Sequence, residues 1–240
     1  MDIAFLYETF VTLISAIPLT LQLAATSVAL GAVLALGLAV CRLSGIWPLD
    51  WFARGYIFIF RGTPLLVQIF LIYYGLGQFR EVRRSAFWFI LRDPYWCAII
   101  ALMLCTAAYS AEIIRGGLQA VPHGQIEAAR ACGMSRFMVF RRIILPLAIR
   151  QALPAYSNEI ISMVKATSLA SIITIMEVTG VAAKIISETY RAIEVFVVAG
   201  AIYLAINFIL TRVVALIEYR LSPHLRQAPA LPAVAAGEMR

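Results

Sequence analysis

Charged residues are scarce in this sequence of 240 residues. Asp, Glu, Lys and Arg make up 14% of it, whereas they make up roughly a quarter of a typical soluble domain. Hydrophobic residues make up 62%. A soluble fold of this length exposes too much surface to hide so many apolar side chains. The composition therefore excludes an ordinary soluble domain and indicates a protein that uses lipid as its solvent.

Histidine and cysteine are also few. The four cysteines, which are Cys41, Cys97, Cys105 and Cys132, form no C-x-x-C pair. This spacing favours neither a zinc site nor a disulfide framework. H-E-x-x-H and G-x-S-x-G are missing, and His123 and His224 lie in expected loops. We therefore predict no metal site and no catalytic residues, so the chain is not expected to be an enzyme.

Lysine is nearly missing, because only Lys165 and Lys184 accompany the arginines in a chain of net charge +7. The arginines lie in short loops between apolar runs and form no basic stripe. They are read as topology signals, and nucleic acid is excluded as a partner. The N-terminus MDIAFLYETF holds no Lys or Arg, so it is not a cleavable signal peptide and the first span is expected to remain.

Five apolar runs are long enough to cross roughly 30 Å of hydrocarbon as helices. They cover about residues 19–41, 57–76, 95–114, 153–175 and 195–217. The sequence thus predicts an all-α membrane protein with five transmembrane helices. Residues 1–226 form one transmembrane domain in this prediction, and residues 227–240, rich in Pro and Ala, form a disordered tail.

Orientation follows from the distribution of Lys and Arg. Segments 42–61, 115–150 and 212–240 hold 13 of these residues, and the segments on the other side hold 6. Because cytoplasmic loops carry the excess of positive charge, this bias predicts an N-out/C-in topology. The loop after the second span is an exception, since it carries four arginines.

The polar stretch 115–150 is the longest loop, and a loop of this length usually has a structure or function of its own. Residues 125–132 favour a helix, Gly133 suits a left-handed turn, and Ser135 can cap a second helix that Pro146 limits. We expect two short helices joined by a glycine turn on the cytoplasmic side. The alternative is an amphipathic loop that lies on the lipid headgroups.

This loop resembles a known signature. Its elements are Glu127-Ala128-Ala129, Gly133, Ile143 and Leu145-Pro146. They match, at the expected spacing, the EAA motif of bacterial ABC-importer permeases of the binding-protein-dependent family. FRGTPLLVQIFLIYYGLG and LPAYSNEIISMVKATSLAS resemble signatures of the polar amino-acid subfamily. The closest likeness is to M-type permeases of histidine/lysine/arginine/ornithine and opine systems, and it spans about residues 15–226.

The resemblance implies a type I ABC-importer permease fold in which the loop forms a cytoplasmic coupling helix. Glu127, Ala128, Ala129, Arg130 and Gly133 are then the residues that couple to an ATPase. The sequence contains no G-x-x-x-x-G-K-[ST], so ATP is expected on a partner subunit and no cofactor on this chain.

The same resemblance implies the partners and the function. They are a second permease subunit, expected to be a paralogue, a dimer of ATP-binding subunits, a periplasmic solute-binding protein and the bilayer of a bacterial inner membrane. The implied function is import of a polar, basic amino acid or opine. An ion-coupled secondary amino-acid transporter is the alternative, which needs coupling-ion sites on broken helices. A role as an assembly protein is a weaker alternative, because it does not explain the charged residues within the spans.

Ionisable and polar groups within spans indicate a translocation path, because they are costly in lipid. Asn158, Glu159 and Ser162, with Gln68 of the second span, are the candidates. Glu159 is expected to hold the cationic side chain of the ligand. The alternative for Glu159 is an ion pair with the second permease.

Other polar residues near the spans are given structural roles. Lys165, Thr167 and Ser168 are assigned to gating and helix packing. Glu112 is expected to pair with Arg115, one helical turn away. Glu177, just after the fourth span, is a further ionisable group without an assigned role.

Overall fold

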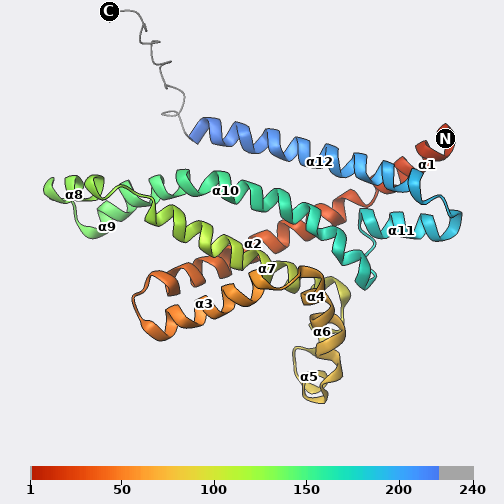
Figure 1. Ribbon diagram of the computed structural model, residues 1–240, viewed down its shortest axis with the longest axis horizontal. Coiled ribbons are helices and arrows are strands. Elements are labelled where there is room, and N and C mark those ends of the chain that lie inside the picture. Colours follow the sequence, from red (N-terminus) through yellow and green to blue (C-terminus); the bar gives the residue numbers. More distant parts are fainter. Residues whose placement is uncertain (1, 222–240) are drawn as a thin grey trace, which may run out of the picture.

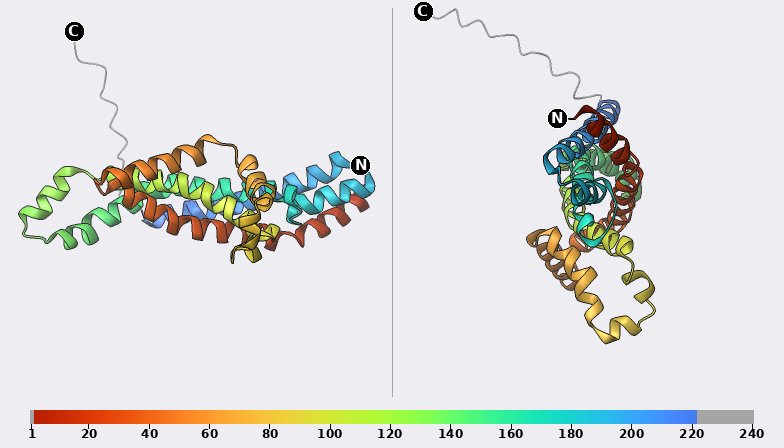
Figure 2. Two further views of the ribbon diagram at one scale, coloured as in Figure 1. Left: turned by 90° about the horizontal axis from the view of Figure 1, so that it is seen from below. Right: turned by 90° about the vertical axis from the view of Figure 1, so that its right-hand side faces the viewer.

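The computed structural model describes residues 2–221, and its long helices run side by side along one axis (Figures 1 and 2). They are α2 (Ile17–Leu43), α7 (Pro94–Gln119), α10 (Leu145–Ala166) and α12 (Ala192–Leu221). The preceding helix α1 (Ile3–Ile14) continues into α2 and packs against the start of α12. Three helical stretches are long and apolar enough to cross a membrane, or up to five if each of two bent pairs counts as one span.

Three predicted spans agree with this architecture. The predicted ranges 19–41, 95–114 and 195–217 lie inside α2, α7 and α12, and each helix extends further at both ends. Many large apolar side chains on these helices remain exposed, among them Val33, Leu204 and Phe208. Exposed apolar side chains in this number need lipid or another subunit to cover them, as expected of a membrane-embedded protein.

Small residues hold α2 against α7. Ala24, Ser27, Gly31 and Ala35 follow one another at spacings of three and four on the buried face of α2. A Cβ added to Gly31 would lie 2.3 Å from Cγ2 of Thr106 on α7. Only glycine therefore permits this crossing, as in other close contacts between membrane helices.

The second predicted span, 57–76, is wrong as a single helix. Helix α3 (Trp47–Gly62) has Thr63 as its C-terminal cap, and α4 (Leu65–Phe70) begins after Pro64. A π-turn (Leu71–Gly75) and a 3₁₀-turn (Leu76–Gln78) follow, and the two parts meet at 104°. The break arises because Pro64 donates no hydrogen bond and forces Thr63 into an extended conformation.

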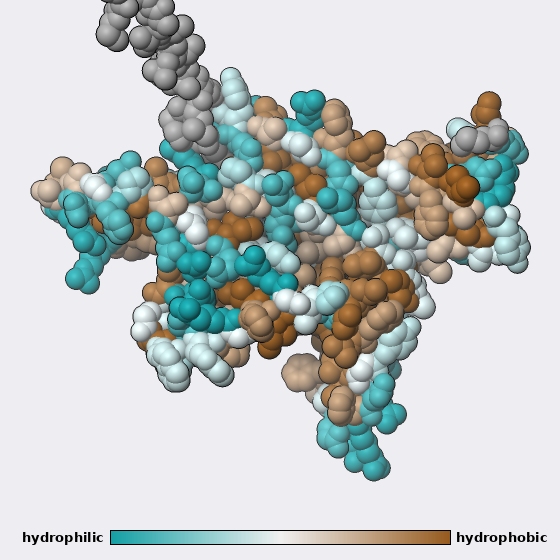
Figure 3. Space-filling model, viewed as in Figure 1, coloured by the Kyte–Doolittle hydropathy of each residue, from teal (hydrophilic) through white to brown (hydrophobic). Residues whose placement is uncertain are grey.

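A lobe leaves the bundle after this break. It contains α5 (Arg80–Arg84) and α6 (Trp88–Leu91) and projects sideways from the long axis in two views (Figures 1 and 2). Hydrophilic residues gather at its α5 tip, whereas apolar residues gather at its base (Figure 3). The four arginines that break the predicted charge rule lie in and beside these two short helices.

The fourth predicted span, 153–175, falls on a helical stretch that begins well before it. Helical structure starts at α9 (Arg136–Val139), continues through a π-turn (Phe140–Ile144) into α10, and ends in a 3₁₀-turn (Thr167–Ile173). Pro146 does not limit the helix, because it occupies the first turn of α10, where its missing N–H costs least. Pro154 lies inside α10 and does not end it.

The polar loop is correspondingly shorter than the predicted 115–150. Helix α7 continues to Gln119, and α8 (His123–Ala131) and α9 occupy most of the remainder. After α10, the chain bends by 46° and forms α11 (Val178–Thr189) beside the N-terminal end of the molecule. The predicted tail, 227–240, lies outside the described residues.

Candidate coupling loop and translocation path

The turn between α8 and α9 is a complete helix-ending motif. Gly133 has a φ of +77°, and its N–H donates to Arg130 O at 2.9 Å. The N–H of Met134 donates to Ala129 O at 3.2 Å. These two bonds form a Schellman motif, which places glycine in the left-handed conformation. The predicted glycine turn is confirmed.

The second helix of the loop is capped as expected. The Oγ atom of Ser135 accepts a hydrogen bond from the N–H of Met138 at 3.3 Å. The cap begins α9 directly after the turn, so the α8–α9 loop is a defined helix–turn–helix unit. We use the name α8–α9 loop for residues 120–139.

The α8–α9 loop presents an unpartnered surface. Glu127, Ala128, Arg130 and Gly133 are exposed, whereas Ala129 is buried. Phe137 is 71% exposed and follows the turn closely. A large aromatic side chain and two small residues exposed together are typical of a surface that another protein covers.

The loop also lies at one extremity of the molecule. Helices α8 and α9 extend past the end of the bundle, and α1, α11 and the N-terminal residues lie at the opposite end (Figures 1 and 2). The loop residues and the N-terminus would therefore be on opposite sides of a bilayer crossed by the bundle.

Three of the predicted polar residues share one exposed face of α10. Asn158, Ser162 and Lys165 are exposed and follow one another at spacings of four and three. We call this set the polar lane of α10. Helix α10 runs along the bundle (Figure 1), so in a bilayer crossed by the bundle the lane would need water or another subunit to solvate it.

Glu159 lies beside the lane and turns toward α7. It is half-buried, and its Oε1 atom accepts a hydrogen bond from the hydroxyl of Thr106 at 2.8 Å. Among the described residues no ion pair holds this carboxylate. The structure therefore places Glu159 between two helices, with Thr106 as its hydrogen-bond partner and Arg61 near enough to interact with its charge.

Gln68 lies in α4, just after the break at Pro64. Its side-chain N–H groups donate to Phe60 O at 3.0 Å and to Thr63 O at 3.1 Å, so it fastens the chain around Pro64. Its Oε1 atom is buried and has no hydrogen-bond partner among the described residues. Gln68 thus holds the break in place and retains one free acceptor.

The predicted gating residues mark the end of α10. Thr167 is fully buried, and its hydroxyl donates to Val164 O at 2.8 Å. The hydroxyl of Ser168 donates to Lys165 O at 2.7 Å. Both hydroxyls serve the backbone at the point where the α-helix tightens into a 3₁₀-turn.

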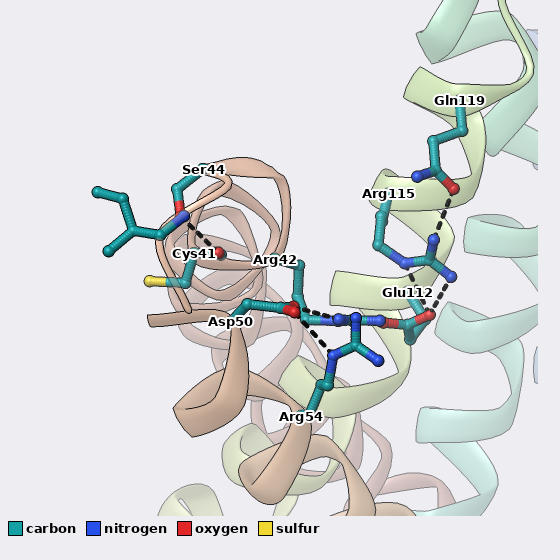
Figure 4. Close-up of polar contacts among 9 residues, drawn as sticks. Cys41, Arg42, Ser44, Asp50, Arg54, Glu112, Arg115 and Gln119 are labelled. Atoms are coloured by element: carbon teal, nitrogen blue, oxygen red, sulfur yellow. Dashed lines mark hydrogen bonds and ion pairs between the residues drawn. The ribbon is translucent and has the colours of Figure 1, made fainter. Parts of the chain in front are cut away.

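A network of ion pairs, of which the sequence indicated only one, joins α2, α3 and α7 (Figure 4). Arg42 pairs with Asp50, and its Nε atom lies 3.3 Å from Oε1 of Glu112. Glu112 pairs with Arg115 at 2.6 Å, as expected. The turn between α2 and α3, which brings Arg42 to Asp50, is the only local signal that could have suggested the first contact.

Glu177 makes a second set of contacts that the sequence did not predict. It is fully buried and caps α11 by accepting the N–H of Gly180 at 2.9 Å. The hydroxyl of Tyr203 on α12 donates to its other oxygen at 2.5 Å. The spacing from Glu177 to Gly180 fits a helix cap, but the contact with α12 has no sequence signal.

Comparison with known proteins agrees with this geometry. The family model for binding-protein-dependent transport system inner membrane components matches residues 27–223. The chain is 66% identical over 225 residues to the octopine transport system permease protein OccM of Rhizobium radiobacter, which covers 94% of this chain and 92% of that protein. It is 56% identical over 227 residues to the nopaline transport system permease protein NocM of Agrobacterium fabrum, covering 94% of each.

More distant relatives share the fold. The arginine ABC transporter permease protein ArtM of Escherichia coli K12 is 47% identical over 171 residues, which are 71% of this chain and 76% of ArtM. A crystal structure of an amino acid ABC transporter with histidines has a TM-score of 0.82 and 37% identity, covering 92% of this chain and 99% of that one. A chain of the MetNI methionine ABC transporter, at 18% identity and a TM-score of 0.71, has the same fold.

These matches confirm the resemblance found in the α8–α9 loop and in the spans. They decide against the ion-coupled secondary transporter that the sequence left open. The chain belongs to the family of binding-protein-dependent transport system inner membrane components, and it is a permease subunit of an ATP-binding-cassette importer rather than an enzyme.

Proposed function

We propose that this permease moves a basic amino acid or an opine from the periplasm to the cytoplasm across a bacterial inner membrane. The names of its relatives support this substrate class, since they include octopine, nopaline and arginine permeases. The transported molecules share a cationic side chain and at least one carboxylate. The polar lane of α10 and Glu159 offer groups for such a ligand.

The observation that carries the proposal is the α8–α9 loop. It is a rigid unit closed by Gly133, it extends beyond the bundle, and it exposes Glu127, Ala128 and Arg130. Small residues allow another backbone to approach, and the two charged residues can pair with a partner. We assign this surface to the ATP-binding subunit.

The proposal includes partners that supply what this chain lacks. ATP binds to a separate dimer of ATP-binding subunits, because the sequence contains no P-loop, and this chain itself binds no cofactor. A periplasmic binding protein delivers the ligand. A second permease subunit, a paralogue of this chain, completes the pathway.

The proposed topology is N-out/C-in with five spans in one permease domain of residues 1–226. Two of these spans are the bent pairs of α3 with α4 and of α10 with α11. The distribution of arginines supports this orientation, because it places the α8–α9 loop on the cytoplasmic side.

The proposed path lies against α10. Asn158 and Ser162 of the polar lane would face water or the second permease, since exposure to lipid is too costly. Glu159 would attract the ligand cation, and the free acceptor of Gln68 would add a polar contact. Lys165, Thr167 and Ser168 would control the outer end of α10 as the subunits rock during alternating access.

Reconstitution tests the proposal. The chain, its ATP-binding subunit and its second permease are placed in liposomes, and uptake of labelled arginine, histidine and octopine is measured with and without ATP and binding protein. We expect uptake of at least one ligand to require both. Uptake that proceeds without ATP would contradict the proposal.

A further inference from the structure

A cavity opens between α3 and α7 near the end of α2. Its volume is about 510 Å³, which is within the range of small-molecule sites. Its lining residues are Arg42, Arg54, Ile57, Phe58, Arg61, Gly62, Tyr109 and Glu112. The lining combines an apolar wall with three guanidinium groups, so we refer to it as the arginine pocket.

Two of the three arginines in the pocket are already paired. Arg42 is held by Asp50 and Glu112, and the Nε atom of Arg54 lies 2.8 Å from Oδ2 of Asp50 (Figure 4). Arg115, at the edge of this network, also pairs with Glu112. Asp50 and Glu112 are thus the two carboxylates that pair with Arg42, Arg54 and Arg115. Arg61 adds a further cation, so the pocket has an excess of positive charge.

Arg61 is the arginine of the pocket whose N–H groups are in no ion pair within residues 2–221. Glu159 is the carboxylate that interacts with its charge at longer range. Its guanidinium carbon lies 4.9 Å from the centroid of the Tyr109 ring, and the side chain is exposed. Stacking on a ring fixes the guanidinium plane but leaves its N–H edge free for a planar anion.

We propose that the arginine pocket receives a carboxylate of the transported ligand, with Arg61 as the principal contact. Guanidinium and carboxylate match in shape and can form two parallel hydrogen bonds, which explains the choice of this anion. Arg54, whose side chain is 64% exposed, is a second donor at the rim. This inference rests on the proposed function, because it adds a carboxylate site to the cation site at Glu159.

The proposal has a consequence for ligand selection. Octopine carries two carboxylates, arginine carries one, and agmatine, which is decarboxylated arginine, carries none. The three ligands share a guanidinium group. Arg61 should therefore discriminate among them by their carboxylates alone.

The test is ligand protection of a cysteine at the rim of the pocket. The four native cysteines are replaced by Ala or Ser, and Phe58→Cys, at a side chain that is 79% exposed, is labelled with a maleimide in the complete transporter in nanodiscs. We expect octopine to protect at the lowest concentration, then arginine, then agmatine. Arg61→Gln should raise the protecting concentration of octopine and arginine at least about tenfold, while that of agmatine stays the same.

A conservative substitution and a change of lipid separate the carboxylate site from a general effect of charge. Arg61→Lys keeps the charge but lacks the planar pair of N–H donors that a carboxylate can bind. The protecting concentration of octopine should therefore lie between the values of wild type and Arg61→Gln. Equal shifts for all three ligands would overturn the carboxylate site. Protection that follows the content of anionic lipid, and not the ligand, would assign the pocket to a lipid phosphate and overturn it as well.

ATP-driven uptake is measured on the same preparation in liposomes. Uptake without dependence on the carboxylate would refute the pocket alone and leave the proposed function intact. A complete lack of ATP-driven uptake of octopine and arginine would contradict the proposed function itself.

Discussion

At the residue scale, the central feature is a carboxylate in a helix of the bundle that has one hydrogen-bond partner, Thr106, and interacts electrostatically with Arg61. Glu159 accepts a hydrogen bond from Thr106 and lies beside the polar lane of α10. A charge within a membrane span is costly in free energy and usually marks a functional site. The place of Glu159 next to an exposed polar face therefore favours a role in attracting a cation. An alternative role is to fasten α10 to α7 through Thr106.

Substitution of Glu159 separates these roles. Glu159→Gln removes the charge but keeps an acceptor for Thr106, and we expect it to lower uptake of a cationic ligand about tenfold or more, because a loss of about 1.4 kcal/mol is a factor of ten. Thr106→Val removes the hydrogen bond but keeps the charge, and should lower uptake only about threefold. Uptake in liposomes gives both values. If Thr106→Val is the more harmful change, Glu159 serves packing.

At the scale of the elements, the contact of α2 with α7 depends on the lack of a side chain at Gly31. A Cβ there would also lie 3.2 Å from Met103 O, so neither helix can give way easily. We expect Gly31→Ala to destabilise the fold by about 1–3 kcal/mol. Gly37→Ala is the matched control, because nothing lies within 4 Å of its added Cβ. The midpoint of thermal unfolding in detergent should fall for the first variant only, and an equal fall would refute this packing.

Helix α11 is held by the buried apolar residues Val178 and Ala182 and by one buried carboxylate. Glu177 both caps the helix and accepts the hydroxyl of Tyr203. Glu177→Ala should cost about 1–2 kcal/mol locally, a typical value for a lost cap, and should speed hydrogen exchange across Val178–Thr189. Tyr203→Phe keeps the cap, so the same segment should remain better protected. Unchanged exchange in Glu177→Ala would show that other contacts hold α11.

Prolines show how far elements could be predicted from the sequence. Pro64 and Pro154 both lie in apolar runs, yet Pro64 breaks a span and Pro154 lies inside α10. The break at Pro64 is fastened by Gln68, whose contacts with Phe60 and Thr63 depend on the folded geometry. In contrast, the α8–α9 turn was predictable, because Gly133 and Ser135 act through local bonds.

At the scale of the whole molecule, the α8–α9 loop and helices α1 and α11 lie at opposite ends of the bundle (Figure 1). The residues assigned to coupling lie close together in the sequence, so their common place in the α8–α9 loop was predictable, whereas their coupling role stays a prediction. The arginine pocket was not, because Arg42, Arg61 and Glu112 come from three helices that only tertiary packing brings together.

The two ends permit a direct test of orientation with cysteine chemistry. Cys132 is exposed in the α8–α9 loop, whereas Cys97 and Cys105 are buried. In a variant that keeps only Cys132, an impermeant maleimide should label inside-out membrane vesicles and spare right-side-out ones. Ser187→Cys, on an exposed position of α11 in a cysteine-free chain, should give the reverse. The opposite pattern would refute the N-out/C-in topology.

The most direct test of the account is whether the turn at Gly133 transmits ATP hydrolysis to transport. Gly133→Asn tolerates a φ of +77°, whereas Gly133→Val does not. Both variants are assembled with the ATP-binding subunit and the second permease, and ATP hydrolysis stimulated by the binding protein is measured together with uptake. We predict that Gly133→Asn keeps most of both activities and that Gly133→Val, although still inserted in the membrane, loses both together. Wild-type hydrolysis and uptake in Gly133→Val would contradict the assignment of the α8–α9 loop as the coupling element.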